Sequence, residues 1–164
     1  MVLRKSFKVE SRHRAVSFHD ITEQVKEIVK EANVKDGIVV VYSHHTTCSV
    51  ITQECAFDMS MTGLETLQQD LVNVFEEWIP TCRYEGMYLH PGHEALVFAE
   101  EHGEDNFGCH NTDAHLRSSI IGRNVTIVMA DGEMDLGEFG RIHFIDWDQT
   151  RARQRTVQVM IIGE

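Results

Sequence analysis

The spacing of apolar residues changes its period along the chain, and this change limits the folds that the chain can adopt. Two segments repeat apolar residues at helical spacing, 21–32 and 64–78. Other segments carry continuous or alternating apolar runs that favour strands: 2–9, 38–42, 125–129, 141–147 and 156–162. Helical patterns therefore lie mainly in the middle of the chain, and strand patterns gather in its last third. This order predicts an α+β domain with mixed or antiparallel sheets, and not a doubly wound parallel sheet.

Capping residues indicate where the helices begin. Asp20 is placed to cap the first helix, and Glu23 three residues later can complete a capping box. A further short helix is expected to start at Asn111 or Thr112 and to reach Ile121. We therefore expect two or three helices.

The strand patterns in the first half of the chain leave more than one arrangement open. The run 38–42 is continuously apolar, which predicts a strand buried on both faces. The segment 49–52 is expected to continue that strand or to pair with it. The region 82–109 is the least regular and is predicted to be a mobile loop, with the acidic run 100–105 exposed to solvent.

Length, composition and charge favour one globular domain over residues 1–164. A net charge of −11 disfavours nucleic-acid binding, which depends on Lys and Arg neutralising phosphates. No apolar run approaches the roughly 20 residues that span a bilayer, and the first residues do not resemble a signal peptide. We therefore expect a cytoplasmic protein without a membrane partner.

The four cysteines do not predict a metal site of their own. They stand at positions 48, 55, 82 and 109 without any CxxC pair, so a Cys-rich zinc site is not expected. In a reducing cytosol they are expected to be small core residues.

Histidine is frequent, with ten in 164 residues, and it is both a common metal ligand and a proton carrier near neutral pH. His45 ends an apolar strand, His90 lies in a loop and His115 lies on the short helix. Imidazoles from three separate elements can converge on one metal ion and leave an open position for substrate. The alternative is that the histidines are scattered over the surface or structurally bonded, because no tight motif such as HExxH is present. Four others are expected to be partly exposed polar residues: His13, His19, His102 and His143.

Carboxylates and arginines supply further candidates. The acidic ones are Glu54, Asp70, Asp113 and Asp146. A carboxylate beside a metal-bound imidazole can orient the ring or act as a general base, although Asp113 also fits a plain helix-start residue. Arg151, Arg153 and Arg155 alternate along a strand-like segment and so share one face, which can bind a phosphate or be a solvated charged face.

Four short motifs follow one another along the chain. They are His45-Thr46-Thr47 followed by a strand and Glu54; Tyr88-Leu89-His90; Ala114 through Gly122, which reads AHLRSSIIG; and Asp131-Gly132 through Leu136-Gly137. They resemble the HTT…NE, Tyr-x-His, AHxKSSxxG and DGxxxLG motifs of the YjbQ family, also called the secondary thiamine-phosphate synthase enzyme family. The likeness runs from the N-terminal strand to Gly163, with the segments in family order.

The resemblance implies a compact YjbQ-like domain that assembles as a homotrimer, with pockets near the subunit contacts. It implies metal ligands at His45, His90 and His115, with zinc as the expected ion. It implies catalytic positions at Glu54, Asp70, Arg151 and Arg153, the first two lining the same pocket. Thr46, Ser118 and Ser119 are expected to help bind an anionic substrate.

The chain also departs from the family pattern. Residues 137–141 read Gly-Glu-Phe-Gly-Arg where the family usually has Gly-Thr-Trp-Gln-Gly, and Gln149-Thr150 replaces Gly-Pro. Asp146 replaces a glutamate, and the insertion between Pro91 and Cys109 is longer than the family's usual loop. Loss of a tryptophan, a large stacking surface, predicts a pocket reshaped for a different ligand.

Three functions follow from these features. The resemblance implies an enzyme that joins a pyrimidine methyl diphosphate to a thiazole phosphate and releases diphosphate, with Mg²⁺ arriving on the diphosphate. The second is zinc-dependent hydrolysis of a small phosphate or acyl compound, with Glu54 or Asp70 as the base. The third is a non-catalytic module that binds a small anion or metabolite.

Overall fold

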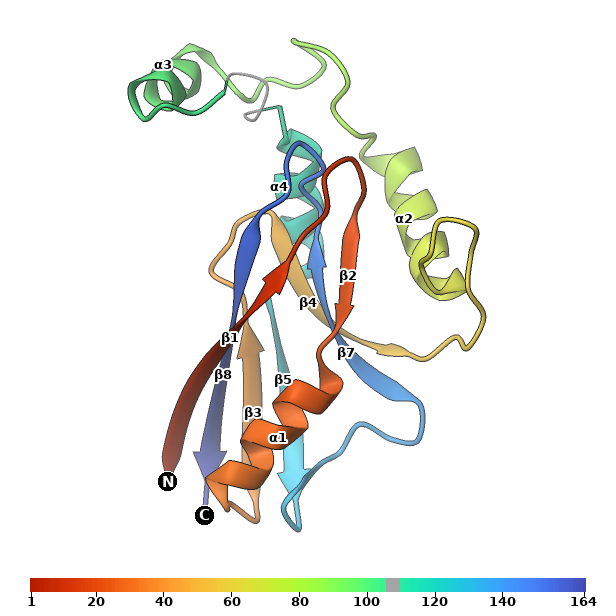
Figure 1. Ribbon diagram of the computed structural model, residues 1–164, viewed down its shortest axis with the longest axis vertical. Helices are drawn as coiled ribbons and strands as arrows, with labels where there is room; N and C mark the ends of the chain where they lie inside the picture. The colour runs from red at the N-terminus through yellow and green to blue at the C-terminus, as the bar shows by residue number, and fades with distance from the viewer. Residues whose placement is uncertain (106–109) are drawn as a thin grey trace.

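The computed structural model describes residues 1–105 and 110–164 (Figure 1). Its strands are β1 Val2–Glu10, β2 Ser17–Asp20, β3 Gly37–Tyr42, β4 Cys48–Glu54, β5 Asn124–Ala130, β6 Glu133–Met134, β7 Gly140–Asp146 and β8 Gln154–Gly163. Its helices are α1 Thr22–Ala32, α2 Thr66–Trp78, α3 His93–Glu101 and α4 Thr112–Ile121. The described ranges thus contain four helices, which corrects the expected two or three.

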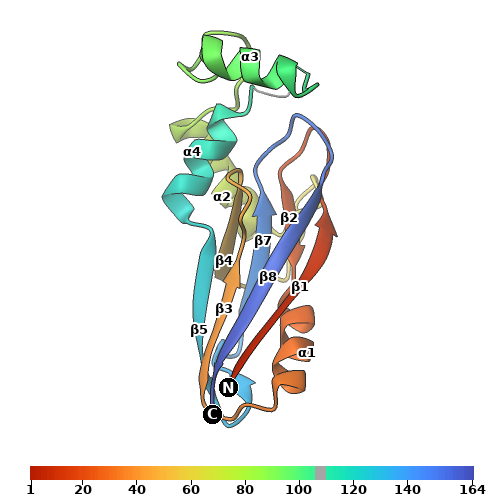
Figure 2. The same cartoon turned by 90° about the vertical axis from the view of Figure 1, so that its left-hand side faces the viewer.

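The strands form two antiparallel sheets. The first has the order β1-β8-β3-β5-β6 and the second the order β2-β7-β4. The three-stranded sheet and α1 lie against the same face of the five-stranded sheet (Figure 2). This arrangement confirms the predicted α+β fold with antiparallel sheets.

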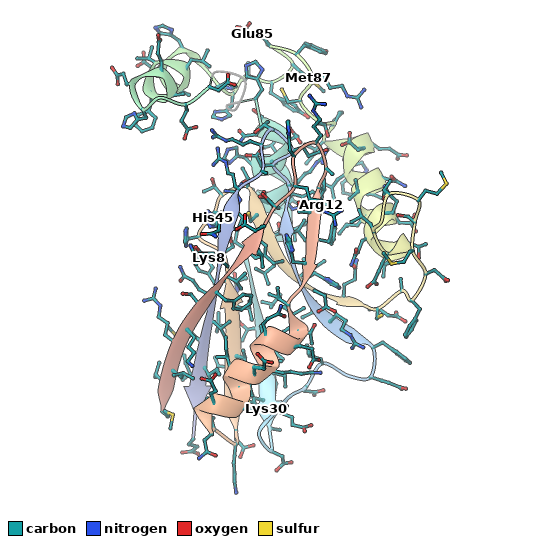
Figure 3. The ribbon with its side chains drawn as sticks, viewed as in Figure 1. Lys8, Arg12, Lys30, His45, Glu85 and Met87 are labelled. Atoms are coloured by element: carbon teal, nitrogen blue, oxygen red, sulfur yellow. The ribbon has the colours of Figure 1, made fainter. Side chains whose placement is uncertain are left out.

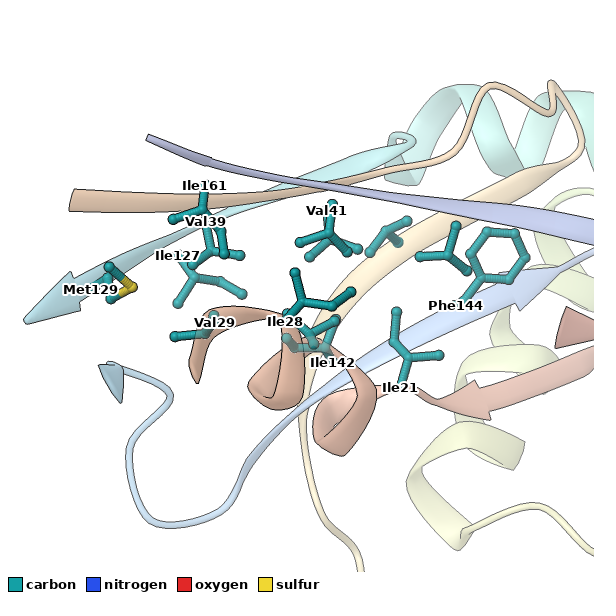
Figure 4. Close-up of a cluster of buried hydrophobic side chains, with 14 of the residues drawn as sticks. Ile21, Ile28, Val29, Val39, Val41, Ile127, Met129, Ile142, Phe144 and Ile161 are labelled. Carbon is teal, nitrogen blue, oxygen red and sulfur yellow. The ribbon is translucent and has the colours of Figure 1, made fainter. Parts of the chain in front are cut away.

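The main hydrophobic core lies between these layers (Figure 4). On β3, Val39 and Val41 point into this core and are 0% exposed, whereas Ile38 on the outer face is 37% exposed. The prediction that this strand is buried on both faces is therefore wrong for the described chain. The run is continuously apolar, but the outer side of the five-stranded sheet faces solvent in the single chain.

Helix α1 forms where its apolar spacing predicts it. The residues of the predicted stripe are all buried: Ile21, Val25, Ile28, Val29 and Ala32. The Asp20 carboxylate accepts a hydrogen bond from the Thr22 N–H at 2.9 Å and so satisfies a free amide of the first turn. Glu23 pairs with Lys26 at 2.8 Å and does not complete the predicted capping box. Asn33 ends the helix in the left-handed conformation, with φ of 49°.

A second apolar cluster joins α2 and α4 to the three-stranded sheet. The ring centroids of Phe75 and Trp147 are 5.3 Å apart. The guanidinium of Arg117, fully buried, lies 5.7 Å from the Trp147 ring and donates to Glu76 at 2.9 Å. Only part of the predicted α2 stripe is covered, because Leu67, Val74 and Trp78 are 38%, 44% and 71% exposed.

Other local expectations also change. Strand β2 has no counterpart in the predicted elements, and the segment 49–52 neither continues β3 nor pairs with it, because β4 pairs with β7. The region predicted as a loop over 82–109 contains α3, whose apolar run over 95–99 precedes the acidic residues. Cys48 is a core residue as expected, Cys55 and Cys82 are half-buried, and Cys109 lies outside the described residues.

None of the helices in the described ranges has the length and apolar character needed to cross a bilayer.

His143 on β7 contradicts the expectation of a partly exposed side chain. It is 0% exposed, and among the described residues neither ring nitrogen has a hydrogen-bond partner. Burial lowers the pKa of His143, because a charged imidazolium loses its hydration there; Asp20 and Glu65 oppose this only in part.

We expect the free energy of unfolding to fall as the pH drops below about 6.5, the ordinary pKa of histidine. The unfolded chain then binds a proton at position 143 that the folded chain takes up only at lower pH, so acid favours unfolding. His19, His45 and His115 act in the same direction, because their pKa values are also lowered. The free energy of unfolding is measured in urea at pH 7 and at pH 5. Its decrease between these two pH values should be smaller in His143→Leu than in the unsubstituted protein. Equal losses would contradict this account.

Candidate functional site

A cavity of about 650 Å³ opens where α3, α4 and the loops preceding β4 and β8 meet, at the upper end of the molecule in Figure 1. The loop between β3 and β4 contributes residues 44–47 to its lining. His90 and His115 line it from the α4 side, and Arg151, Arg153 and Arg155 line it from the chain leading into β8. Side chains far apart in the sequence thus share one space.

His45 lies beside β8, near Lys8 (Figure 3). Its Nε2 atom accepts a hydrogen bond from the Thr156 N–H at 2.9 Å, so in the neutral ring the proton is on Nδ1. Burial, followed by the charges of Arg155 and His44, lowers the pKa of His45 to about 4. The imidazole is therefore neutral at physiological pH and can accept a proton only in acid.

His90 and His115 form an adjacent pair, with ring centroids 5.5 Å apart in an edge-to-face arrangement. Burial lowers the pKa of His115, and the neighbouring His90 lowers it further. The Thr112 hydroxyl on the first turn of α4 donates to the His90 carbonyl at 2.6 Å. That bond ties the loop carrying one imidazole to the helix carrying the other.

Arg155 is the buried member of the arginine set, with only 4% exposure. Its Nε and Nη2 atoms donate to the two carboxylate oxygens of Asp146 at 2.6 and 3.2 Å. Nη2 also donates to the Thr47 hydroxyl at 3.1 Å and lies 3.8 Å from the Asp148 carboxylate. Because its charge is already balanced, Arg155 holds the floor of the cavity in place and is not a free anion-binding group.

Arg151 and Arg153 are half-buried and differ in their partners. Arg151 donates to the Glu104 carboxylate at 2.7 Å. Arg153 is held by its backbone, which exchanges hydrogen bonds with Ser11 at 2.8 and 2.9 Å. Within residues 1–105 and 110–164 its guanidinium makes no hydrogen bond or ion pair. Arg153 is therefore the least compensated positive charge of the cavity.

Two residues outside the predicted set position the arginine segment, which is the stretch 151–155 that carries the three arginines. The Asn111 amide, at the start of α4, donates to Asp148 at 3.1 Å. The other Asp148 oxygen accepts from the Thr150 N–H at 2.9 Å and from its hydroxyl at 2.6 Å. This link fixes the turn just before Arg151. Sequence reasoning missed it because the partners are 37 residues apart and neither stands in a local motif.

The predicted site residues divide into two groups. Six of them line the cavity: His45, Thr46, His90, His115, Arg151 and Arg153. Four lie outside its lining: Glu54, Asp70, Ser118 and Ser119. Ser118 is buried and donates to the Cys48 carbonyl at 2.6 Å, whereas Ser119 donates to the His115 carbonyl at 2.8 Å. The catalytic roles of Glu54 and Asp70 stay predictions, without a place in this cavity.

The three predicted metal ligands share the cavity but do not fit one ion as they are placed. In the described part of the chain, no group of three or more His, Cys, Asp or Glu side chains is arranged to hold a metal. The Nε2 atom of His45 is taken by Thr156, and the positive charge of Arg155 acts on the same ring. His90 and His115 remain a pair that can offer one nitrogen each. The zinc site at His45, His90 and His115 therefore stays a prediction.

Two face-packed antiparallel sheets define an α+β domain with a histidine- and arginine-lined cavity at one end. The chain belongs to the YjbQ family: the family described as UPF0047 protein YjbQ-like matches residues 5–164. A UPF0047 protein of Methanocaldococcus jannaschii is 30% identical over 164 residues, which cover 100% of this chain and 96% of that protein. The UPF0047 protein YugU of Bacillus subtilis is 25% identical over 141 residues, 86% of this chain and 87% of YugU.

Solved structures agree with this assignment. The crystal structure of a hypothetical protein of Aeropyrum pernix superposes with a TM-score of 0.73 at 28% identity, covering 99% of both chains. A YjbQ/UPF0047 family protein of Clostridium acetobutylicum gives a TM-score of 0.71 at 24% identity, covering 96% of this chain and 99% of that one, and supports the fold alone. The family and the fold predicted from the sequence motifs are both confirmed.

Proposed function

We propose that the cavity binds a small phosphorylated compound. The observation that carries this proposal is the uncompensated guanidinium of Arg153 in a cavity that also holds Arg151, Arg155 and four histidines. The chain as a whole has a net charge of −11, so such a concentration of basic side chains is a local exception. Arginine binds phosphate oxygens through paired, charge-assisted hydrogen bonds.

The reaction that we propose is transfer of a pyrimidinylmethyl group, the pyrimidine ring with its attached methylene, from diphosphate to a thiazole phosphate. The thiazole ring nitrogen forms a bond to the methylene carbon while the bond from that carbon to the diphosphate oxygen breaks. The departing diphosphate takes the electron pair, and Arg153 and Arg151 stabilise its developing charge. Thr46, on the exposed loop beside His45, supplies a hydroxyl for the substrate. We propose that Mg²⁺ enters the cavity bound to the diphosphate of the substrate.

The alternative functions use the same cavity. A hydrolase needs a base near the substrate, and the neutral imidazole of His45 is such a group, but its Nε2 is occupied by Thr156. A binding module needs only the arginines and histidines. Synthesis, hydrolysis of a phosphate compound and binding of a phosphorylated metabolite all require a phosphate site in this cavity, whereas hydrolysis of an acyl compound does not.

Isothermal titration with inorganic phosphate and with diphosphate tests the site directly. We expect both anions to bind, diphosphate more tightly, and their affinities to weaken as ionic strength rises. Binding should persist in EDTA, because guanidinium groups and not a metal hold the anion. Absence of binding for both anions would overturn the phosphate site. Binding that is lost in EDTA and restored by zinc would revive the three-histidine metal site, for which His115→Ala is the matching variant.

Turnover separates the enzyme from the binding module. The purified protein is supplied with pyrimidine methyl diphosphate, thiazole phosphate and Mg²⁺, and released diphosphate is measured. We expect release that requires both precursors. Release with the diphosphate substrate alone supports the hydrolase, and tight binding of the precursors without any release supports the module.

We also propose that the protein assembles as a homotrimer. On the outer face of the five-stranded sheet, paired residues of four neighbouring strands form one exposed apolar row: Val2, Ile162, Ile38 and Val128. Such a contiguous row is typical of an interaction surface. Gln158, on the same face, contacts the ring of His44, which lines the cavity, so the row and the cavity lie on adjoining surfaces. A monomeric mass by light scattering at micromolar concentration would refute the assembly.

A further inference from the structure

Helix α3 forms a second, chemically different wall of the cavity. Ala95, Phe98 and Ala99 line the same space as the arginines and histidines. In Figure 2 the helix lies across the end of the molecule, beyond α4. Its apolar side chains therefore face the space that holds the cationic groups, which gives the cavity two unlike walls.

Phe98 is the prominent side chain of this wall. It is 61% exposed and lines the cavity, so part of its ring is open to a ligand there. Its ring stacks on His102, with centroids 3.9 Å apart and planes inclined by 23°. The His102 N–H donates to the Phe98 carbonyl at 3.1 Å, and the ring Nδ1 lies 2.7 Å from the same oxygen. The aromatic ring is thus held in place before any ligand arrives.

The C-terminal end of α3 is linked to the side of the cavity that carries the arginines. Glu104, just after α3, donates its backbone N–H to the Ala99 carbonyl at 2.8 Å. Its carboxylate accepts from Arg151 at 2.7 Å. Helix α3 and the arginine segment are therefore joined by an ion pair, and the apolar wall keeps a defined place relative to the phosphate-binding groups.

We propose that α3 adds a specificity-determining residue to this site: Phe98 packs against the aromatic or heteroaromatic ring of a ligand whose phosphate lies on Arg153. This inference rests on the proposed phosphate site and adds to it a specificity-determining residue. A ring packed against a fixed aromatic side chain gains binding free energy that a bare phosphate or a small alkyl phosphate does not.

The test compares phenyl phosphate with methyl phosphate, two monoesters of equal charge that differ in the ring. By calorimetric titration, phenyl phosphate should bind the unsubstituted protein about fivefold or more tightly than methyl phosphate, the order expected for one aromatic contact. In Phe98→Ala the two affinities should become nearly equal, with that of methyl phosphate unchanged. Val97→Ala is the matched control, because Val97 is exposed on the same helix and lies outside the cavity lining.

The outcomes separate this inference from the function on which it rests. Binding of both esters with a ratio that Phe98→Ala does not change, or with no preference at all, overturns the role of α3 and leaves the phosphate site standing. Failure of both esters to bind overturns both. Unchanged binding of methyl phosphate in Phe98→Ala also shows that this variant is folded, so a lost preference cannot come from a lost structure.

Discussion

Replacing Asp146 by alanine is expected to lower the free energy of unfolding by about 3–5 kcal/mol, the cost of leaving a buried ion without its partner. Asp146 is 0% exposed and Arg155 is 4% exposed, so hydration replaces only a small part of the lost carboxylate. Asp148, 3.8 Å from Arg155, offers partial compensation and places the loss toward the lower end. Urea unfolding monitored by circular dichroism at pH 7 measures the change.

The matched control for this prediction is Glu104→Ala, which removes the carboxylate of another arginine pair in the same part of the molecule. Arg151 and Glu104 are 32% and 46% exposed, so hydration replaces most of what this pair provides, and the loss should stay within about 1 kcal/mol. If Asp146→Ala costs no more than this control, the buried network is not what holds the floor of the cavity.

Much of the fold could be predicted because burial imposes a period on the sequence. The α1 stripe and the strands β3, β5, β7 and β8 pack into one core, so their apolar spacing is a direct trace of their contacts. The missed elements leave a weaker trace. β2 has four residues and β6 two, too few to show an alternation. α3 buries only Ala99, so its apolar run lacks a clear stripe.

The site could be predicted only in part, because its motifs report residue types and not distances. His45 and Glu54 belong to one motif, yet β4 carries the chain from Cys48 to Glu54 away from the cavity, a rise of about 20 Å at strand spacing. Arg151, Arg153 and Arg155 do line one cavity, although only Arg155 lies on β8 and the other two precede that strand. The pairing of Arg155 with Asp146 is a tertiary contact that residue spacing in the sequence cannot predict. It leaves Arg151 and Arg153 as the arginines available to a ligand.

Substituting alanine for Arg153 is expected to weaken phosphate binding about tenfold to hundredfold, the value of one or two charge-assisted hydrogen bonds. The fold should survive, because Arg153 is held by backbone bonds to Ser11 that alanine keeps. The loss should exceed that in Arg151→Ala, because the Nη2 atom of Arg151 is engaged by Glu104 and its guanidinium has fewer donors left for the ligand. Calorimetric titration with inorganic phosphate measures both affinities.

Arg83→Ala completes the experiment as a control for net charge. Arg83 is exposed and lies outside the cavity lining, so its removal changes the total charge by the same amount without touching the proposed phosphate position. If general electrostatic attraction alone binds the anion, Arg153→Ala and Arg83→Ala should have equal affinities for phosphate. Raising the salt concentration should then bring both affinities to that of the unsubstituted protein. If Arg153 contacts the anion directly, Arg153→Ala should bind phosphate far more weakly than Arg83→Ala at every salt concentration. Equal affinities in these variants would show that the guanidinium of Arg153 does not touch the anion.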